Sequence, residues 1–225
     1  MHRMTQIHIF LTGVYPCSYL SEQVARSEVV SENISDPSLY CLLSQNGFRR
    51  SGQMIYRPAC DSCHACKPIR IPVALFTANR SQQRTWQRNQ DLQIKVLPLI
   101  YQAEHYALYQ RYQAARHRDG DMQHNSVEEY SDFILNSPVE SRLVTFYLNG
   151  VLCMVSLVDY LQDGLSAVYT FFDPDLDKRS LGVFNVLWQI QACQTLGLDY
   201  CYLGYWIKES RKMAYKTQYK PYELL

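Results

Sequence analysis

The sequence predicts an α+β fold, in which a small cysteine-bearing N-terminal part precedes a larger part built on an antiparallel meander and one crossover. Asn149-Gly150 joins two β-like segments, and this dipeptide is the strongest short hairpin signal. A long helical segment over 180–196 stops at Gly197 and leads into a strand at 200–203, which is a strand–helix–strand crossover. With 225 residues, 47% hydrophobic and 19% charged, the chain is long and apolar enough to bury its own core.

The remaining elements follow from local patterns and are divided between two predicted parts, residues 1–76 and residues 77–225. Ser35 or Asp36 caps a helix to about Gln45, which Gly47 ends. Helical periodicity or polarity predicts further helices over 79–90, 103–117 and 126–136. Alternating or β-branched runs predict strands over 48–50, 54–57, 69–73, 92–98, 142–148, 151–160 and 165–172.

Composition and charge exclude several classes of protein. The net charge of +1 argues against a highly basic nucleic-acid coat protein, so any nucleic-acid contact must come from local patches. No apolar run reaches the 18 or more residues of a membrane span, and the first residues lack the pattern of a signal peptide. We therefore expect a cytoplasmic protein that binds neither membrane nor DNA. In that reducing compartment, eight cysteines are core residues, metal ligands or catalytic thiols rather than disulfides.

Three cysteines with two residues between successive members, Cys60, Cys63 and Cys66, have the spacing of a metal or cluster site. A closed site needs a fourth ligand, and Cys17 is the best candidate, ahead of Cys41 and His64. The site would hold Zn or an Fe–S cluster. The alternative is that these thiols are reduced and structural. Three further cysteines lie in strand or helix patterns typical of the core: Cys153, Cys193 and Cys201.

A second candidate site is the turn Arg179-Ser180-Leu181-Gly182 at the start of the last long helix. A helix N-terminus exposes unpaired N–H groups that suit an anion or a developing oxyanion. The turn resembles the first half of the pyrophosphate-binding turn of acyl-CoA N-acyltransferases, but Phe184 stands where that family has a small residue. The alternative is an ordinary helix start.

Two cationic stretches could contact RNA. Arg80, Arg84 and Arg88 share one face of a predicted helix, which is either a solvated face or a contact to an RNA backbone. Aromatic and cationic residues also alternate near the C-terminal side, as stacking on bases and binding to phosphates would require; the alternative is an amphipathic surface. This second set comprises Tyr205, Trp206, Arg211, Lys212, Tyr215 and Lys216.

Several separated blocks, in order, together resemble one family. They include Cys17-Ser-Tyr-Leu, Tyr56-Arg57-Pro58 before the cysteine run, Tyr169-Thr-Phe-Phe-Asp173-Pro, the turn at 179–182 and the blocks 202–207 and 212–216. The chain resembles aminoacyl-tRNA–protein transferases of the arginyltransferase type, and its short length resembles the bacterial branch, the aspartate/glutamate leucyltransferases. The likeness spans nearly the whole chain.

The resemblance implies an N-acyltransferase (GNAT)-like core that transfers leucine from leucyl-tRNA to the N-terminal Asp or Glu of proteins, marking them for degradation. Eukaryotic relatives hold an Fe–S cluster on N-terminal cysteines that are spaced differently. Three alternatives stay open: an arginyl-tRNA–protein transferase, a CoA-dependent N-acetyltransferase, and a non-catalytic metal- and RNA-binding module.

The implied chemistry is aminolysis of an ester, which needs positioning and oxyanion stabilisation more than a strong base, and no cofactor. An α-amine with a pKa of about 8 is partly neutral near pH 7. We expect Tyr169, Asp173, Ser180 and Gly182 to form the catalytic centre, with Arg179 at the donor. A fixed cation must read the acceptor carboxylate. We expect Arg57 to do so, with Arg211 and Lys212 in reserve.

Overall fold

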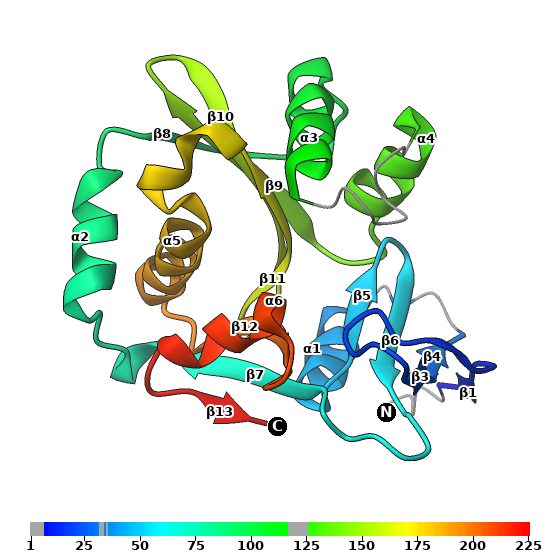
Figure 1. The fold of residues 1–225 in the computed structure, drawn as a ribbon. Coiled ribbons are helices and arrows are strands. Elements are labelled where there is room, and N and C mark those ends of the chain that lie inside the picture. The colour runs from blue at the N-terminus through cyan, green and yellow to red at the C-terminus, as the bar shows by residue number, and fades with distance from the viewer. Residues whose placement is uncertain (1–6, 32–33, 35, 117–125) are drawn as a thin grey trace.

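The computed structural model describes residues 7–31, 34, 36–116 and 126–225, and a seven-stranded mixed sheet organises them (Figure 1). The strand order is β13-β7-β12-β11-β10-β9-β8. The strands are β7 (Lys67–Pro72), β8 (Gln93–Leu97), β9 (Ser141–Leu148), β10 (Val151–Tyr160), β11 (Gly164–Phe172), β12 (Tyr200–Trp206) and β13 (Glu223–Leu224).

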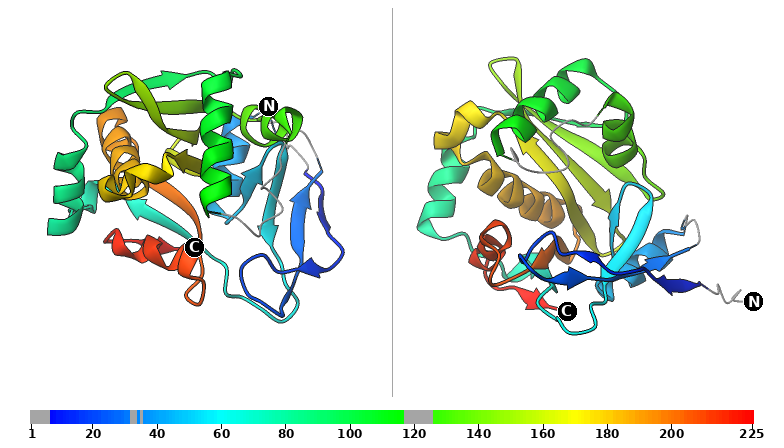
Figure 2. Two further views of the ribbon diagram at one scale, coloured as in Figure 1. Left: turned by 45° about the horizontal axis from the view of Figure 1, so that its top comes forward. Right: turned by 45° about the vertical axis from the view of Figure 1, so that its right-hand side comes forward.

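Helices cover both faces of this sheet (Figures 1 and 2). One face packs against α2 (Arg80–Arg88) and α5 (Leu181–Leu196), and the other against α3 (Ala103–Arg116) and α4 (Val127–Tyr130), which continues as a π-helical turn over Ser131–Leu135. The period-2 alternation of a strand explains this division. In β9, Val144 and Phe146 belong to the core under α5, whereas Leu143 and Tyr147 belong to the core under α3.

The predicted meander and crossover are confirmed. β9, β10 and β11 pair antiparallel in sequence order, and α5 carries the chain to β12, which pairs parallel to β11. Other helices begin where a side chain can bond free N–H groups: Asp36 caps α1 (Pro37–Gln45), and Asn79 and Ser126 form capping boxes. The predicted helix over 126–136 differs from the structure only in that its second half is π-helical.

The N-terminal residues form a four-stranded sheet in the order β1-β4-β6-β5 and a short two-stranded ribbon, β2-β3. The bounds are β1 (Ile9–Leu11), β2 (Tyr15–Pro16), β3 (Val24–Ala25), β4 (Ser27–Val30), β5 (Arg49–Ser51) and β6 (Met54–Pro58). Their core continues into the large sheet through Tyr202 and Leu161. β7, which precedes the predicted boundary at residue 76, also pairs within the large sheet. The two-part division stays a prediction.

A buried ion pair joins the two sheets. Arg50 of β5 donates three hydrogen bonds of 2.6–2.9 Å to the carboxylate of Asp159 on β10, and both side chains are fully buried. Tyr40 and Ser141 donate their hydroxyl protons to the same carboxylate. Arg50 also donates from Nη1 to Gly52 O and from Nη2 to Ser141 Oγ, so each of its three nitrogens has an acceptor.

The lengths and hydropathies of the helices also bear on membrane insertion. Among the residues that the structure describes, no helix combines the length and apolarity needed to span a bilayer.

Asp159→Asn should destabilise the fold by about 3–5 kcal/mol, because it leaves the buried Arg50 charge without a counter-charge. Urea unfolding followed by circular dichroism measures the loss. Glu140→Gln is the matched control, because it removes a carboxylate from the exposed Arg142–Glu140 pair and should cost less than about 1 kcal/mol. Equal losses in the two variants would contradict the role of Asp159.

Candidate functional site

The site is built where β11 and β12 stop pairing. Their parallel ladder covers only Gly164–Ser166 against Tyr200–Tyr202, although both strands continue beyond it. Gly164 permits the close start of this ladder, because a Cβ there would lie 2.3 Å from Tyr200 O. We call the region beyond the ladder the strand-end site; it comprises Tyr169–Asp173, Ser180–Gly182, Gly204–Trp206 and Tyr215–Lys216.

The start of α5 lies at this site. A 3₁₀-helix, η3 (Pro174–Arg179), follows β11, and Ser180 then adopts the left-handed region with φ 53° and ψ 47°. No side chain caps α5, so the N–H groups of Leu181 and Gly182 have no partner within the helix. A Cβ at Gly182 would lie 3.5 Å from the Phe172 ring. Alanine therefore fits at this position, whereas a larger residue would press on Phe172.

Arg179 fastens this turn to the end of α2. Its two terminal nitrogens donate to the two oxygens of Asp91, both at 2.8 Å, and it also bonds Arg88 O. The hydrogen bond from Arg179 holds the pKa of Asp91 below its usual range. The guanidinium is thus engaged in the protein itself, and its predicted contact with substrate stays a prediction.

Helix α3 holds the predicted residues of β11 in place. Gln113 donates to the hydroxyl of Tyr169 at 3.1 Å, and Arg111 pairs with Asp173 at 2.9 Å. The other Asp173 oxygen accepts from Asp175 N and caps η3. Sequence reasoning missed Arg111 and Gln113, because polar residues on an amphipathic helix are normally solvated and nothing local distinguishes these two.

A polar row inside the core connects α5 with the sheet, and the sequence analysis also missed it. Asn185 donates to Thr170 Oγ1 at 2.9 Å, Thr170 bonds Ser156 at 3.0 Å, and Gln189 donates to Ser156 Oγ at 3.3 Å. Asn185 and Gln189 are 3% and 0% exposed. Two amides four residues apart on an otherwise apolar helix were the available sequence signal.

The predicted aromatic and cationic set divides by burial. Tyr205 is buried and donates its hydroxyl proton to Gly47 O at 2.8 Å, so its ring is not an open surface for base stacking. Trp206 is half-buried, and its indole N–H has no partner in the described residues. Arg211 and Lys212 of α6 (Arg211–Ala214) are exposed, as is Tyr215.

Lys216 is the buried cation of this set. It lies in the 3₁₀-helix η4 (Tyr215–Gln218) and is 7% exposed. Its Nζ donates to Tyr205 O at 2.6 Å and lies 3.2 Å from Met213 Sδ. Burial, and after it the charge of Arg49, lowers the pKa of Lys216 to about 7.

Arg57 is already partnered. Its Nε donates to Glu28 Oε2 at 2.5 Å, its Nη1 donates to Asn46 O, and its guanidinium lies 4.7 Å from the centre of the Phe48 ring. The side chains of Arg57 and Glu28 are 39% and 30% exposed, so an acceptor carboxylate would have to compete with Glu28. The predicted reading role of Arg57 stays a prediction.

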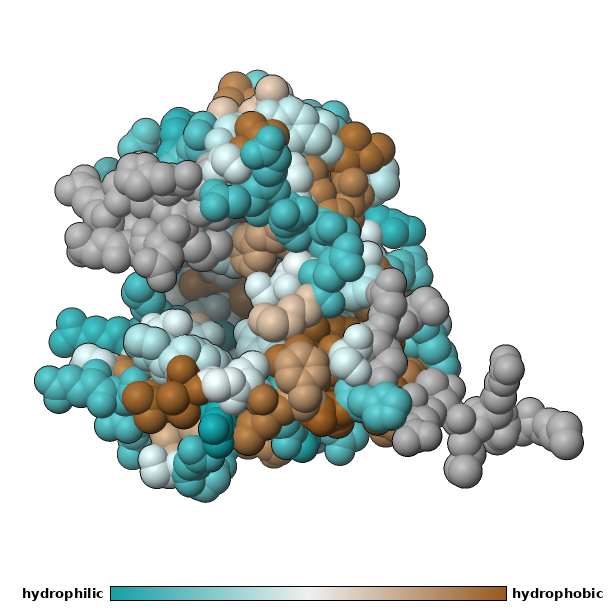
Figure 3. Space-filling model, turned by 90° about the vertical axis from the view of Figure 1, so that its right-hand side faces the viewer, coloured by the Kyte–Doolittle hydropathy of each residue, from teal (hydrophilic) through white to brown (hydrophobic). Residues whose placement is uncertain are grey.

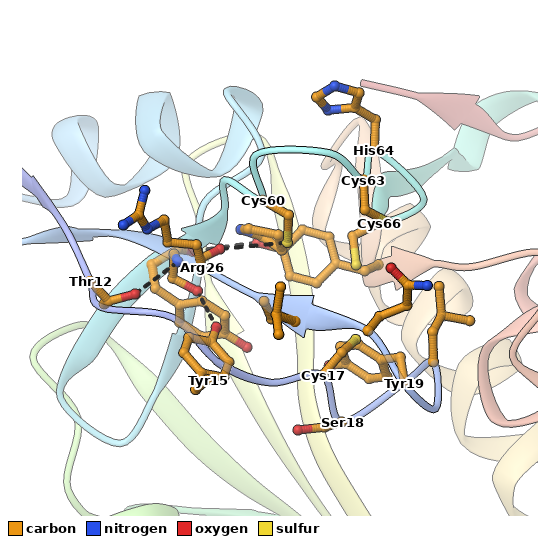
Figure 4. Close-up of a pocket in the computed structure, with 18 of the residues that line it drawn as sticks. Thr12, Tyr15, Cys17, Ser18, Tyr19, Arg26, Cys60, Cys63, His64 and Cys66 are labelled. Atoms are coloured by element: carbon orange, nitrogen blue, oxygen red, sulfur yellow. Dashed lines mark hydrogen bonds between the residues drawn. The ribbon is translucent and has the colours of Figure 1, made fainter.

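The four predicted metal ligands line one pocket of about 490 Å³ between the small sheet, the cysteine loop and Tyr205 (Figure 4). They are Cys17, Cys60, Cys63 and Cys66. Burial, followed by the charges of the other three thiols, raises the pKa of Cys66 to about 11. The sequence therefore identified thiols that lie near one another.

The chemistry of four thiols suits Zn or an Fe–S cluster, but their arrangement is not that of a formed centre. Within the described residues no three His, Cys, Asp or Glu side chains converge as metal ligands. Cys60 bonds Arg26 O, and the His64 ring points away from Cys17 (Figure 4). Cys41 lies elsewhere and donates to Asp163. The predicted core positions of Cys153, Cys193 and Cys201 are confirmed.

One side of the molecule carries a hollow. Figure 3 shows it left of the centre, below the grey atoms, with hydrophobic side chains at its bottom. Tyr112 of α3 packs on Phe172 of the strand-end site, with ring centres 5.0 Å apart. Residues of α3 therefore border the β11 side of this site.

Solved structures share the fold at low sequence identity. The C-terminal domain of a putative lysylphosphatidylglycerol synthetase from Agrobacterium fabrum aligns with a TM-score of 0.53 at 13% identity, covering 83% of this chain and 62% of that one. FemX aligns with a TM-score of 0.51 at 7% identity, covering 92% of this chain and 81% of that one.

Sequence comparisons are more specific. An aspartate/glutamate leucyltransferase from Chromobacterium violaceum is 52% identical over 99% of this chain and 93% of its own length. Proteins of the same name from Nitrosospira multiformis and Hahella chejuensis are 51% and 44% identical, over 97% and 100% of this chain and 88% and 97% of their own lengths. Residues 15–84 match the N-terminal part of arginine-tRNA-protein transferase and residues 104–225 its C-terminal part. As its motifs predicted, the chain belongs to the arginine-tRNA-protein transferase family of aminoacyltransferase enzymes.

Proposed function

We propose that this enzyme transfers leucine from leucyl-tRNA to the N-terminal Asp or Glu of acceptor proteins and so marks them for degradation. The observation that carries this proposal is the 52% identity, over almost all of both chains, to an aspartate/glutamate leucyltransferase. Charged tRNA as the donor implies that the reaction takes place in the cytoplasm.

The proposed core is of the GNAT type. The support is the seven-stranded mixed sheet in which a parallel pair, β11 and β12, stops pairing next to the N-terminus of α5. Diverging strands leave backbone groups unpaired, and the N–H groups of Leu181 and Gly182 lie beside them. This is the place where an ester carbonyl can meet hydrogen-bond donors, and we assign the aminoacyl end of the donor to it.

The chemistry at this site is direct aminolysis. The acceptor α-amine attacks the ester carbonyl carbon, and the N–H groups at the start of α5 stabilise the developing oxyanion. Tyr169 and Asp173, held by Gln113 and Arg111, line the end of β11 and position the reactants. No covalent enzyme intermediate is required, because the ester is already activated.

The buried position of Phe184 argues against CoA as the donor. It is 1% exposed and packs against Trp86 and Phe146, with ring centres 5.3 and 5.9 Å apart. A core aromatic residue thus occupies the place where acyl-CoA N-acyltransferases have a small residue. The exposed cations Arg211 and Lys212, and Arg80 and Arg84 on α2, offer contacts to an RNA backbone instead.

Leucine should pass from leucyl-tRNA to a peptide with N-terminal Asp. The assay follows radiolabelled leucine and arginine from their tRNAs, side by side, into peptides that differ only in an N-terminal Asp, Glu or Asn. Acetyl-CoA serves as a third donor. Transfer of arginine alone would assign an arginyltransferase, acetylation would assign an N-acetyltransferase, and tRNA retention without transfer would assign a binding module. Each of these results would overturn the proposal.

Arg57→Ala should reduce the preference for Asp over Asn peptides about 10- to 150-fold. A hydrogen bond to a charged group contributes about 1.5–3 kcal/mol, which corresponds to that ratio. The measurement is kcat/KM for both peptides. Glu28→Gln is the informative companion, because it frees the Arg57 guanidinium and should keep or raise the preference. If the preference survives in Arg57→Ala and falls in Arg211→Ala or Lys212→Ala, those cations read the carboxylate.

The purified enzyme should contain Zn or Fe if the pocket thiols bind metal, and Cys63→Ser and Cys66→Ser should each lower the metal content. Elemental analysis by mass spectrometry measures it, with absorbance near 400 nm as the check for an Fe–S cluster. Cys41→Ser is the control, because Cys41 is outside the pocket and serine preserves the bond to Asp163. Equal metal content in all variants would show that these thiols are structural.

A further inference from the structure

We propose that the amine of Lys216 is the proton acceptor in the transfer reaction: it takes a proton from the attacking α-amine and returns it to the leaving ribose oxygen. This inference rests on the proposed function and assigns to Lys216 a role beyond the substrate contact that its position in the sequence suggested. It stands on the geometry around Gly204.

Gly204 exposes Lys216 to the strand-end site. The glycine has a φ of +78°, and Lys216 Nζ, at 3.7 Å, is the only non-neighbouring atom of the described residues within 4 Å of where its Cβ would lie. Gly204 lies beyond the last β11–β12 ladder pair and is partly exposed. The missing side chain thus leaves open space beside the strand, and the amine borders that space.

The surroundings of Lys216 favour a neutral amine. Arg49 from β5 contributes a second positive charge, β12 contributes the carbonyl of Tyr205, and α6 contributes the thioether of Met213. Tyr205 directs its hydroxyl away, to Gly47 O. Among the described residues, no carboxylate forms an ion pair with Lys216. Burial next to a like charge disfavours the ammonium form, consistent with the pKa of about 7.

Arg49 is itself confined. It donates from Nη1 to Ser44 O and Phe48 O, while its Nε and Nη2 are buried without a partner. Its guanidinium lies 5.3 Å from the centre of the Tyr202 ring and 6.0 Å from that of Tyr205. Arg49 therefore cannot move away from Lys216 without losing buried contacts.

The proton balance of the reaction is complete without a cofactor. As the α-amine nitrogen bonds to the ester carbonyl carbon, it becomes positively charged and gives one proton to the neutral Lys216. The bond between the carbonyl carbon and the ribose oxygen then breaks, and the oxygen leaves with that proton. The products are the amide, tRNA with a free hydroxyl and neutral Lys216. A base whose pKa is near the working pH suits both transfers.

The test is the pH dependence of kcat/KM for leucine transfer to an Asp peptide. In the wild type, kcat/KM should rise with pH in two steps. One has its midpoint near pH 7 and belongs to Lys216, and the other, near pH 8, belongs to the peptide's own α-amine. Lys216→Met, which is close in volume, should lose the step near pH 7 and about 100-fold or more in rate at that pH. Lys208→Met, on an exposed lysine nearby, should change neither.

Lys216→Arg separates a proton acceptor from a positioning residue. Arginine can still donate to Tyr205 O, but it stays protonated at every accessible pH. It should therefore be as inactive as Lys216→Met. Recovery of activity in the arginine variant, or a pH profile that Lys216→Met leaves unchanged, would overturn the proposal. Because wild-type transfer is measured in the same assay, this failure is distinct from the absence of leucine transfer, which would overturn the proposed function.

Two further measurements extend the test. The first, on stability, does not depend on activity, and the second tests the neighbouring charge of Arg49. The unfolded chain holds the Lys216 proton up to the ordinary pKa of 10.5, whereas the folded chain releases it near pH 7. The free energy of unfolding of the wild type, relative to Lys216→Met, should therefore rise with pH across this window. Arg49→Met should move the rising limb of activity to higher pH, whereas Arg49→Lys should leave it in place. An unmoved limb in Arg49→Met would contradict the proposal.

Discussion

The Arg50–Asp159 ion pair fixes how the two sheets of this enzyme lie relative to each other. It is fully buried, and partners from three other positions, Tyr40, Ser141 and Gly52, satisfy its remaining groups. A buried pair of this kind contributes little net stability against an apolar replacement, but it tolerates only one geometry. That geometry places Arg49, the neighbour of Arg50 on β5, against the rings of Tyr202 and Tyr205. The charge of Arg49 also contributes to the lowered pKa of Lys216. The position of the small sheet is therefore coupled to the electrostatics of the strand-end site.

In the proposed mechanism, the strand-end site contributes to the reaction in two different ways. On the β11 side, the start of α5 offers backbone N–H groups that α3, α2 and η3 hold through Asp173, Asp91 and Arg179. On the β12 side, a glycine with no side chain leaves a buried amine next to open space. Oxyanion stabilisation needs donors that do not move, whereas proton transfer needs a group that can exist in two protonation states. The divergence of two strands supplies room for both within a continuous sheet.

Elements with a strong local pattern could be predicted from the sequence, and contacts between distant residues could not. The hairpin at Asn149-Gly150 and the helix ending at Gly197 depend on local backbone preferences, so their bounds were nearly right. Cys60, Cys63 and Cys66, which share a regular spacing, line one pocket with Cys17, and their role as metal ligands stays a prediction. Arg57 and Arg179 were predicted to contact substrate, and no local pattern shows that each is paired with a carboxylate far away in sequence, Glu28 or Asp91. The burial of Lys216 likewise depends on contacts with β5 and β12. The alternation of aromatic and cationic residues over 205–216 gives no indication that this lysine is buried.

The place of β7 in the large sheet has a consequence for synthesis on the ribosome. β7 pairs with β12 and β13, and the paired residues Arg70 and Tyr202 are 132 positions apart. Ile69 and Ile71 of β7 are completely buried in the finished protein. During translation this strand emerges long before its partners, so both of its edges and its two isoleucines are exposed to other nascent chains in the meantime. Contacts of such long range also fold slowly. The period between the emergence of β7 and that of β12 is therefore when the chain is most vulnerable to aggregation and most in need of a chaperone.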